Sequence, residues 1–358
     1  MSSASPDVLW VDDLSDDSLP VAGSKIARLG ALRRCGVKVP DGFVVTTSVF
    51  ERFLEGTGLV KAIDDLLRPV SSDADDAIAS VSAEVRQAIE QTPIPDAISH
   101  ALVDAYEELS YRNRDLNIPV AVRSSATGED AADASFAGQF DTYLGITGSA
   151  RLIDAVRRCW ASLFTDRAVG YRLRKGLDHR TSPMAVGVLE LVHARASGVA
   201  FSVHPVTGSP HRMVIEGSWG WGEAVVQGLV TPDHAEIGKT DRRILEYTVA
   251  DKTVVSAFDY AQGLVVEHEM PSRLRKERIL DEEQVGAIVD AVLAIEAQYG
   301  YAVDVEWVLD RHRRAGEPMT IVQTRPVTVT AGQAETATDT GWDPVAYAAR
   351  YAFGGNKT

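Results

Sequence analysis

Four polar residues near the end of the chain have the types and the spacing of a site for a metal ion and phosphate. In YAVDVEWVL the side chains alternate, so Asp304 and Glu306 project from one face of an expected strand. The next extended stretch, MTIVQTRP, places Gln323 and Arg325 on one face in the same way. DRHRRAGEP between the two stretches can close a hairpin, which would bring the four side chains onto one sheet.

The chemistry of this set favours a hard cation and an anion. Two buried acids at i and i+2 repel each other unless a cation lies between them. Oxygen ligands of this kind suit Mg²⁺, which keeps several waters and shares phosphate oxygens with the protein. Arg325 beside them would hold a phosphate in a bidentate fashion. The alternative is a solvent-facing strand with ordinary salt bridges, and the spacing alone favours neither.

Two earlier stretches also have features of phosphate-binding loops. In AVRSSATGEDAADASFAGQFDTYLG, Arg123 ends an expected strand, and the small residues after it let backbone N–H groups approach an anion. SFAGQ could fold over phosphates as a flap, with Gln139 offering its amide. Lys25 opens a helix after a small-residue loop, where the N–H groups and the helix dipole favour phosphate. Neither stretch has the pattern GxxxxGK[ST] or GxGxxG, and a solvated loop is the alternative for each.

These side chains must be positioned by a mixture of helices and strands, so we expect an α+β fold. KIARLGALRR is amphipathic and Gly36 suits its terminator, residues 50–115 are expected to be mainly helical, and Leu152, Val156, Trp160 and Leu163 have helical spacing. The glycine-rich stretch EGSWGWGEAVVQG, with two tryptophans, fits no element clearly. The further expected elements are one helix at 151–176, another at 282–299, and strands at 43–47, 118–123, 184–192, 197–203 and 212–218.

Composition limits the class of protein. The chain has 358 residues, of which 45% are hydrophobic, so more than one lobe with a sizeable core is expected. A formal net charge of −15 argues against nucleic acid and anionic membranes as partners. Cys35 and Cys159 have no metal-binding spacing, and we expect both to lie in or near the core of a protein in a reducing compartment. The N-terminus has no signal-peptide pattern and no apolar run could span a bilayer, so a cytoplasmic location is expected.

Four blocks of sequence together resemble a known family. VAGSKIARLGALRRCGVKVPDGFVVTT, AVRSSATGEDAADASFAGQFDTYLG, SWGWGEAVVQGLVTPD and VDVEWVLD with IVQTRP occur in the order seen in phosphoenolpyruvate synthases, pyruvate phosphate dikinases and rifampicin phosphotransferases. The likeness covers roughly residues 10 to 328. It implies the ATP-binding domain of that family, an ATP-grasp-type, multi-lobed α+β fold that closes on the nucleotide between lobes. The likeness also implies that this chain binds ATP with Mg²⁺.

The resemblance assigns roles to individual residues and ranges. Lys25 and Arg123 resemble phosphate-binding cations that take part in catalysis together with Arg325, and Glu306 and Gln323 are the implied magnesium ligands. The remaining cofactor-binding positions are Gly138 and Gln139 in the phosphate-covering loop, Glu190 and Val192 in the strand that lines the adenine pocket, and Asp304 in the metal and phosphate cluster. The expected organisation is an N-terminal lobe over 1–117, central and C-terminal lobes over 118–328, a linker over 329–340, and a tail over 341–358 that could be a docking helix.

The chain departs from the family pattern in three respects. Ser24 precedes the lysine where the family usually has glycine. Leu189, Glu190 and Leu191 stand where the family usually has glutamine, a basic residue and methionine, so base contacts through a glutamine side chain would be lost. The family also has a swivelling domain whose histidine, in a TxSHxA-like setting, accepts phosphate from ATP. None of the eight histidines of this chain has that setting, and we expect them to be structural or surface residues.

Three functions remain open at this point. In the first, the chain activates ATP, giving AMP and phosphate, for transfer to a histidine on a separate polypeptide that also carries the substrate domain, and then to pyruvate or another small molecule. In a simple variant of this reading the chain is a domain taken from a longer protein. In the second, it is a stand-alone ATP-grasp kinase or ligase that phosphorylates a small acceptor directly and leaves ADP. The third is a non-catalytic regulatory module that binds a nucleotide.

Overall fold

The computed structural model describes residues 6–127, 141–178, 183–222, 230–259, 262 and 264–327. Helices and antiparallel sheets both contribute, which confirms the α+β class. The chain forms two compact units, one made of Met1–Ala31 and Asp41–Leu191, the other of Leu32–Pro40 and Val192–Thr358. Within the described ranges, no helix is long and apolar enough to cross a membrane.

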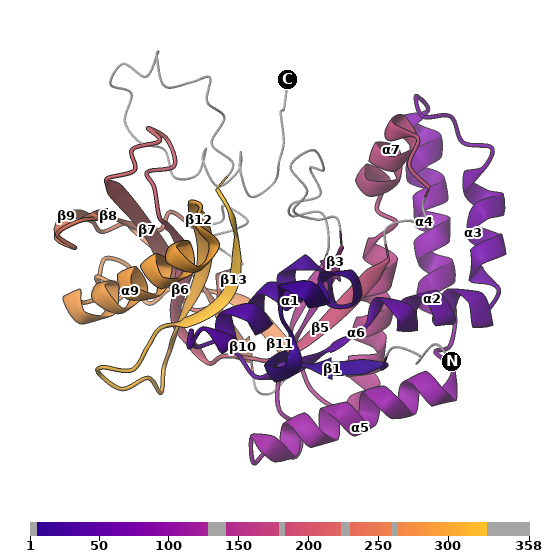
Figure 1. Ribbon diagram of the computed structural model, residues 1–358, viewed down its shortest axis with the longest axis horizontal. Coiled ribbons are helices and arrows are strands. Elements are labelled where there is room, and N and C mark those ends of the chain that lie inside the picture. Colours follow the sequence, from indigo (N-terminus) through magenta and orange to yellow (C-terminus); the bar gives the residue numbers. More distant parts are fainter. Residues whose placement is uncertain are drawn as a thin grey trace. The chain divides into compact units, whose positions relative to one another are not determined.

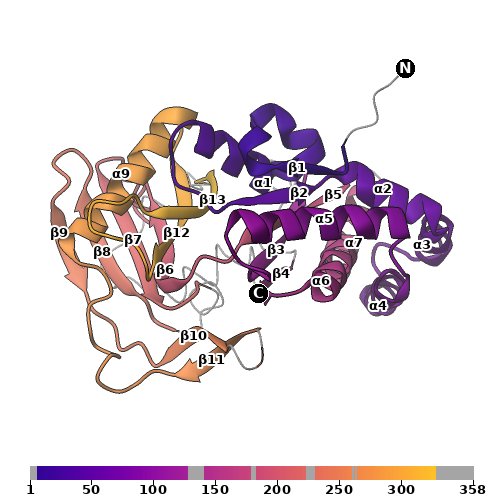
Figure 2. The ribbon, with the colours of Figure 1, turned by 90° about the horizontal axis from the view of Figure 1, so that it is seen from below.

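The first unit is built on a five-stranded antiparallel sheet with the order β1-β2-β5-β3-β4. On one side, α6 contacts β3, β4 and β5, and α4 packs against α6 and α7. Figures 1 and 2 show α5 beside β1 and β2, which it also contacts. The elements are β1 (Val8–Trp10), the short helices η1 (Val11–Asp13) and η2 (Asp16–Ser18), α1 (Leu19–Arg34), β2 (Gly42–Val45), α2 (Thr47–Gly56), α3 (Leu59–Leu67), α4 (Asp75–Gln91), α5 (Asp96–Arg112), β3 (Val120–Ala126), β4 (Thr142–Ile146), α6 (Ser149–Ser162), α7 (Asp166–Lys175) and β5 (Met184–Glu190).

A large aromatic cluster fills the core of this unit. Trp160 on α6 stacks on Phe53 with ring centroids 5.0 Å apart, and Phe50 lies 5.6 Å from the same ring. All three side chains are buried, so this face of the sheet and the helices over it are joined by the burial of a large apolar area. Cys159 beside Trp160 is buried as expected, but the expectation for Cys35 is wrong because it is exposed just past the end of α1.

The second unit is built on a six-stranded antiparallel sheet with the order β13-β12-β6-β7-β8-β9, and α9 contacts β12 and β6. A separate hairpin, β10 with β11, follows β9 in the chain. Figure 1 labels these elements. They are β6 (Ala194–Phe201), β7 (Arg212–Trp219), β8 (Asp233–Gly238), β9 (Ile244–Thr248), β10 (Val254–Asp259), β11 (Leu264–Glu269), α9 (Glu282–Tyr299), β12 (Val303–Asp310) and β13 (Thr320–Pro326).

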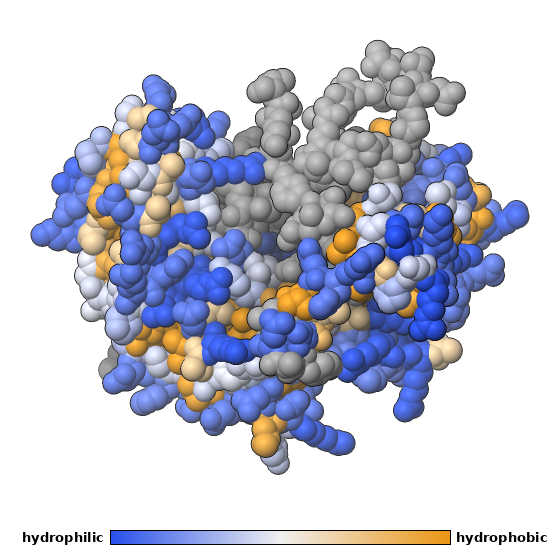
Figure 3. Space-filling model, turned by 180° about the vertical axis from the view of Figure 1, so that it is seen from behind, coloured by the Kyte–Doolittle hydropathy of each residue, from blue (hydrophilic) through white to orange (hydrophobic). Residues whose placement is uncertain are grey.

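Hydrophilic residues dominate the face drawn in Figure 3. Among the described residues, the most exposed large apolar side chains are Tyr111 and Leu116, at 84% and 89%. They lie at the end of α5 and in the turn after it. Single apolar side chains of this kind are common on protein surfaces and indicate no site by themselves.

Candidate functional site: a polar face on the second sheet

The hairpin expected from the sequence is present. β12 and β13 pair antiparallel, with Asp304 opposite Arg325 and Glu306 opposite Gln323. Directly opposed residues of antiparallel strands share one face of the sheet, so the four side chains lie together as predicted. A bulge follows Glu306, and the pairing continues beyond it in a shifted register, with Trp307 opposite Ile321. The other face of β12 carries Trp307, which is fully buried, and this packing fixes the direction in which the polar side chains point.

Asp304 and Arg325 form an ion pair within this face. Arg325 Nε donates to Asp304 Oδ2 at 2.7 Å. Asp304 is only 7% exposed, and this burial raises the pKa of its carboxyl, against the lowering effect of Arg325; the charge of Glu306 adds to the rise. The structure therefore holds a carboxylate where its charged form is costly, which is a common property of functional sites.

Glu306 and Gln323 offer a carboxylate and a carboxamide from neighbouring strands. Glu306 is partly exposed and Gln323 is 8% exposed. The residue that faces Glu306 across the hairpin is neutral, whereas Asp304 faces a guanidinium. A single carboxylate with an amide oxygen suits Mg²⁺, which takes few protein ligands and fills its other positions with water and phosphate oxygens. The donor set therefore fits a magnesium ion bound together with a phosphorylated ligand.

A second polar group lies on the same face, and the sequence analysis did not predict it. The cross-strand register continues from Glu306 on β12 through Val199 on β6 and Glu216 on β7 to His234 on β8. His234 Nδ1 lies 3.1 Å from Glu216 Oε1, and both residues are buried. Three strand spacings separate β8 from β12, roughly 14 Å, so this group is distinct from the hairpin set.

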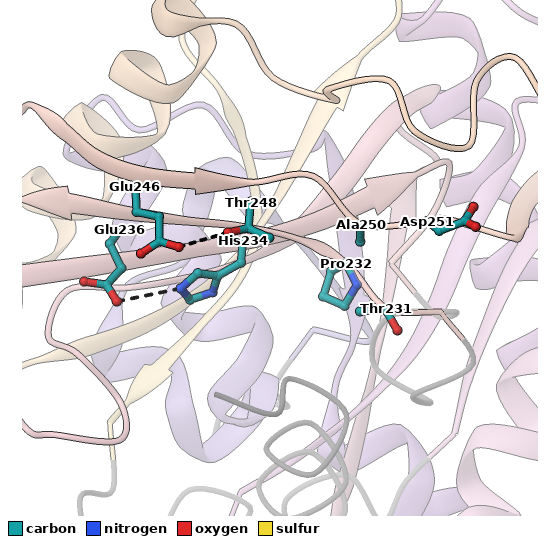
Figure 4. Close-up of a pocket in the computed structure, with 8 residues that line it drawn as sticks. All are labelled: Thr231, Pro232, His234, Glu236, Glu246, Thr248, Ala250 and Asp251. Atoms are coloured by element: carbon teal, nitrogen blue, oxygen red, sulfur yellow. Dashed lines mark hydrogen bonds and ion pairs between the residues drawn. The ribbon is translucent and has the colours of Figure 1, made fainter. Parts of the chain in front are cut away.

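A pocket of about 490 Å³ opens beside His234 (Figure 4). His234 Nε2 lies 4.0 Å from Glu236 Oε1, and His204 Nε2 lies 3.6 Å from the same oxygen. Burial lowers the pKa of His204, against the raising effect of Glu236. No three His, Cys, Asp or Glu side chains of the described chain are arranged to hold a metal ion. The lining residues are Thr231, Pro232, His234, Glu236, Glu246, Thr248, Ala250 and Asp251.

In the first unit, Lys25 lies directly after a break in α1. Gly23 has φ 67° and ψ 167°, so the helix from Leu19 to Arg34 is interrupted there. A side chain at Gly23 would collide with the backbone of Ser125 on β3, so only glycine lets the chain pass this close. The sequence analysis expected a small-residue loop before Lys25. In the structure these residues belong to α1, and only Gly23 has a non-helical backbone.

Arg123 lies on the sheet face that α1 covers. Its cross-strand partner on β5 is Gly187, where a side chain would collide with Ile26. The Ile26 N–H also donates to Ser125 Oγ at 3.3 Å, two residues along β3 from Arg123. Ile26, which follows Lys25, therefore packs on the strands β3 and β5 at the level of Arg123. Lys25 and Arg123 both belong to the first unit, and the hairpin set belongs to the second.

The expected base-lining strand is β5 and the residues after it. The N–H groups of Glu190 and Leu191 donate to the carbonyls of Asp41 and Pro119, at 2.8 and 2.9 Å. The carbonyl of Val192, the next residue, accepts the indole N–H of Trp221 at 3.0 Å. The positions predicted for the phosphate-covering loop, Gly138 and Gln139, lie outside the described residues, as do the predicted linker 329–340 and tail 341–358.

Comparison with known proteins assigns the class. Residues 19–342 match the family described as pyruvate phosphate dikinase, AMP/ATP-binding domain. The chain belongs to this family, as the sequence blocks predicted.

The relatives are longer proteins. The chain is 40% identical over 332 residues to a probable phosphoenolpyruvate synthase of Methanothermobacter thermautotrophicus, covering 93% of this chain and 47% of that protein. It is 36% identical to a phosphoenolpyruvate synthase of Aeropyrum pernix, covering 92% and 43%. The chain thus spans about half the length, or slightly less, of these curated relatives. A solved acetyl-coenzyme A synthetase of Korarchaeum cryptofilum aligns with 12% identity and a TM-score of 0.31 over 63% of this chain and 83% of that one. The family match, and not this distant likeness, carries the assignment.

Proposed function

We propose that the chain binds ATP with Mg²⁺ and activates it for phosphoryl transfer. The observation that carries this proposal is the β12–β13 hairpin, where a partly buried ion pair and a carboxylate–carboxamide pair occupy one face. Glu306 and Gln323 would hold the magnesium ion, and Arg325, fixed by Asp304, would hold phosphate oxygens. When bound, Mg²⁺ neutralises charge on the phosphates. Phosphoryl transfer needs this neutralisation and positioning more than it needs a covalent group from the protein.

The remaining predicted residues would bind other parts of the nucleotide. Lys25 and Arg123 are assigned to the phosphates, because a lysine at a helix start and an arginine on a small-residue strand suit an anion. Glu190 and Val192 are assigned to the base, and Gly138 with Gln139 to a loop over the phosphates. Their positions in the family blocks support these roles.

The proposed reaction converts ATP, one water and a histidine into AMP, phosphate and phosphohistidine, which then phosphorylates pyruvate or another small molecule. The histidine and the substrate site would belong to a separate domain or polypeptide. Two facts support this: the relatives named phosphoenolpyruvate synthase extend well beyond the matched region, and the histidines of this chain lack the expected setting. A cytoplasmic protein would have all of these substrates available.

Product analysis tests the proposal. The chain is incubated with Mg²⁺ and ATP labelled at the β-phosphate, with and without a histidine-bearing domain from one of the longer relatives, and the nucleotides are separated. We expect AMP, and label on the added domain, only when that domain is present. ADP formed by the chain alone with a small acceptor would instead favour the direct kinase, and saturable binding with no turnover in any mixture would favour a regulatory module.

A further inference from the structure

The stretch Ser218–Gly222, SWGWG, spans the last two residues of β7 and the turn after it, and the proposed phosphate chemistry does not explain it. Trp219 and Trp221 are each 9% exposed. Both indole N–H groups donate to backbone carbonyls, that of Trp219 to Leu274 at 3.2 Å and that of Trp221 to Val192 at 3.0 Å. The two tryptophans are therefore equivalent in burial and in type of bond, but they hold different segments of the chain.

The backbone between the two tryptophans is held from several sides. Gly220 has φ 77°, and a side chain there would collide with the carbonyl of Ser256 on β10. Its N–H donates to the carbonyl of Arg195 at 3.0 Å, and its own carbonyl accepts Ser197 Oγ–H at 2.6 Å. The N–H of Trp221 donates to the same Ser256 carbonyl at 3.3 Å. The position of the Trp221 ring is thus fixed by β6 and β10.

The residues before Val192 offer few polar side chains to a ligand. Leu189 and Leu191 are apolar and 1% and 4% exposed, so neither can replace a glutamine that would hydrogen-bond a base. The backbone N–H groups of Glu190 and Leu191 already have carbonyl partners within the first unit. If residues 189–192 bind the base, its selection therefore depends mainly on their backbone carbonyls and on the groups that orient these carbonyls.

We propose that Trp221 is a positioning residue for base selection, acting through the carbonyl of Val192. This inference rests on the proposed function, in which Val192 contacts the base. A carbonyl oxygen has two lone pairs, so it can accept the indole N–H and a second donor together. An oriented carbonyl favours a base that presents an exocyclic amine, as adenine does, over one that presents a carbonyl oxygen at the same position. Trp221 supplies the orientation and does not itself touch the nucleotide.

The test compares Trp221→Phe with Trp219→Phe in the full chain. Each change removes one indole N–H bond and keeps an apolar ring, so both should lower the melting temperature. The dissociation constants of ATP and inosine triphosphate, which has oxygen in place of the amine, are measured with Mg²⁺ by calorimetry. We expect Trp221→Phe to reduce the preference for ATP about fivefold, the effect of one hydrogen bond, and Trp219→Phe to leave the preference unchanged.

The outcomes separate this inference from the proposed function. If the wild-type chain binds neither nucleotide, the proposed function fails. If the wild-type chain binds ATP, and all three proteins prefer ATP over inosine triphosphate to the same degree, only the inference about Trp221 is overturned. An equal loss of preference in both variants also overturns it, because the effect would then be general loosening. Should Trp221→Phe not fold, Trp221→Tyr, which also lacks the indole N–H, replaces it in the same titrations.

Discussion

Two opposing effects act on the pKa of Asp304 in the β12–β13 hairpin. Burial raises the pKa of its carboxyl, and the neighbouring Arg325 lowers it without cancelling the rise. A carboxyl whose folded-state pKa exceeds its unfolded value stabilises the fold at pH values below the unfolded pKa, and this contribution is lost as the pH rises through the folded pKa. At neutral pH the charged form of Asp304 therefore costs stability, which is expected where a charge serves binding.

Replacing Asp304 by asparagine should accordingly separate stability from activity. At pH 7 the urea unfolding free energy of Asp304→Asn should equal that of the wild type or exceed it by about 1 kcal/mol, because the buried charge is removed and Arg325 is 26% exposed and can be hydrated. ATP turnover with Mg²⁺ and the histidine-bearing domain should fall. A loss of several kcal/mol in stability at pH 7 would mean that the ion pair is structural and would contradict this account.

The sequence predicted the shared face of these four residues because alternation in a strand depends only on residue spacing. It could not predict the burial of Asp304, which depends on elements far away in the chain. The sequence also could not predict the hydrogen bond from Trp221 to Val192. The two residues are 29 positions apart, and the bond depends on the positive φ of Gly220 beside Trp221. Ser24 differs from the family glycine, and the structure gives it a partner, because its hydroxyl donates to the carbonyl of Ala126 at 3.4 Å.

Among the elements, the basic turn RHRR between β12 and β13 is tied to the start of α9. Both terminal nitrogens of Arg313 donate to the carboxylate of Glu283, at 2.7 and 2.9 Å, and the N–H of Gly316 donates to the same group at 3.0 Å. The bonds from Arg313 and then from Gly316 lower the pKa of Glu283 from 4.5 to about 2. The turn thus holds the hairpin against the helix that packs on its apolar face.

Glu283→Gln should destabilise the protein in a pH-dependent way. A depressed folded-state pKa gives stability that is present above the unfolded pKa and is lost as the pH falls through the folded pKa. The difference in urea midpoint between wild type and Glu283→Gln should therefore be full at pH 7 and shrink between about pH 4.5 and 2. Glu282→Gln, one residue earlier in the same helical turn, is the control, and an equal effect of the two changes would refute the assignment.

The β10–β11 hairpin is anchored by one buried carboxylate. Asp233 accepts hydrogen bonds from Lys252 Nζ at 2.5 Å and from the N–H of Ala250 at 3.0 Å, both before β10, and from the N–H of Ile279 after β11 at 3.1 Å. Tyr247 on β9 donates its hydroxyl at 3.0 Å. Asp233 on β8 thus joins both ends of the hairpin to the last two strands of the six-stranded sheet, β8 and β9, which explains the aspartate of the VTPD block.

Asp233→Asn should cost about 3–5 kcal/mol of unfolding free energy, because it leaves the fully buried Lys252 ammonium without its counter-charge. Lys252→Met should cost less, since Asp233 keeps three other donors. Urea unfolding gives both values, and hydrogen exchange should report faster opening of residues 250–279 in Asp233→Asn. If Lys252→Met were the more destabilising change, the carboxylate would not be the anchor.

Sequence periodicity predicted some elements better than others. The prediction of a helix at 282–299 is confirmed, because its apolar stripe is continuous and a capping box at Asp281 and Gln284 marks its start. The single helix expected over 151–176 is two helices, α6 and α7, since the Thr165 side chain caps a new helix by accepting the N–H of Ala168. Strands β8 to β11 were not predicted, because each has only five or six residues and the buried apolar pair of β8, Ala235 and Ile237, is too short an alternation to stand out.

At the scale of the whole molecule, the proposed ligand groups come from both compact units. Lys25 and Arg123 belong to the sheet of the first unit, and Glu306, Gln323 and Arg325 to that of the second. With a net charge of −15 the protein repels a polyanion on average. In the proposed function, binding of ATP depends on these basic groups and on a magnesium ion to offset the net charge locally. The division into lobes at residues 117 and 328 stays a prediction.

The most direct test of this claim is a calorimetric titration of ATP into the wild-type chain and single variants at fixed Mg²⁺. Lys25→Met removes a cation from one unit and Glu306→Gln removes a carboxylate from the other; Lys61→Met and Glu282→Gln, at exposed positions, are the controls. We predict saturable binding by the wild type, unchanged in both controls and weakened at least about tenfold in each site variant. Chelating Mg²⁺ should weaken wild-type binding and have little effect on Glu306→Gln. Absence of wild-type binding, or equal affinity in the site variants and their controls, would contradict the account.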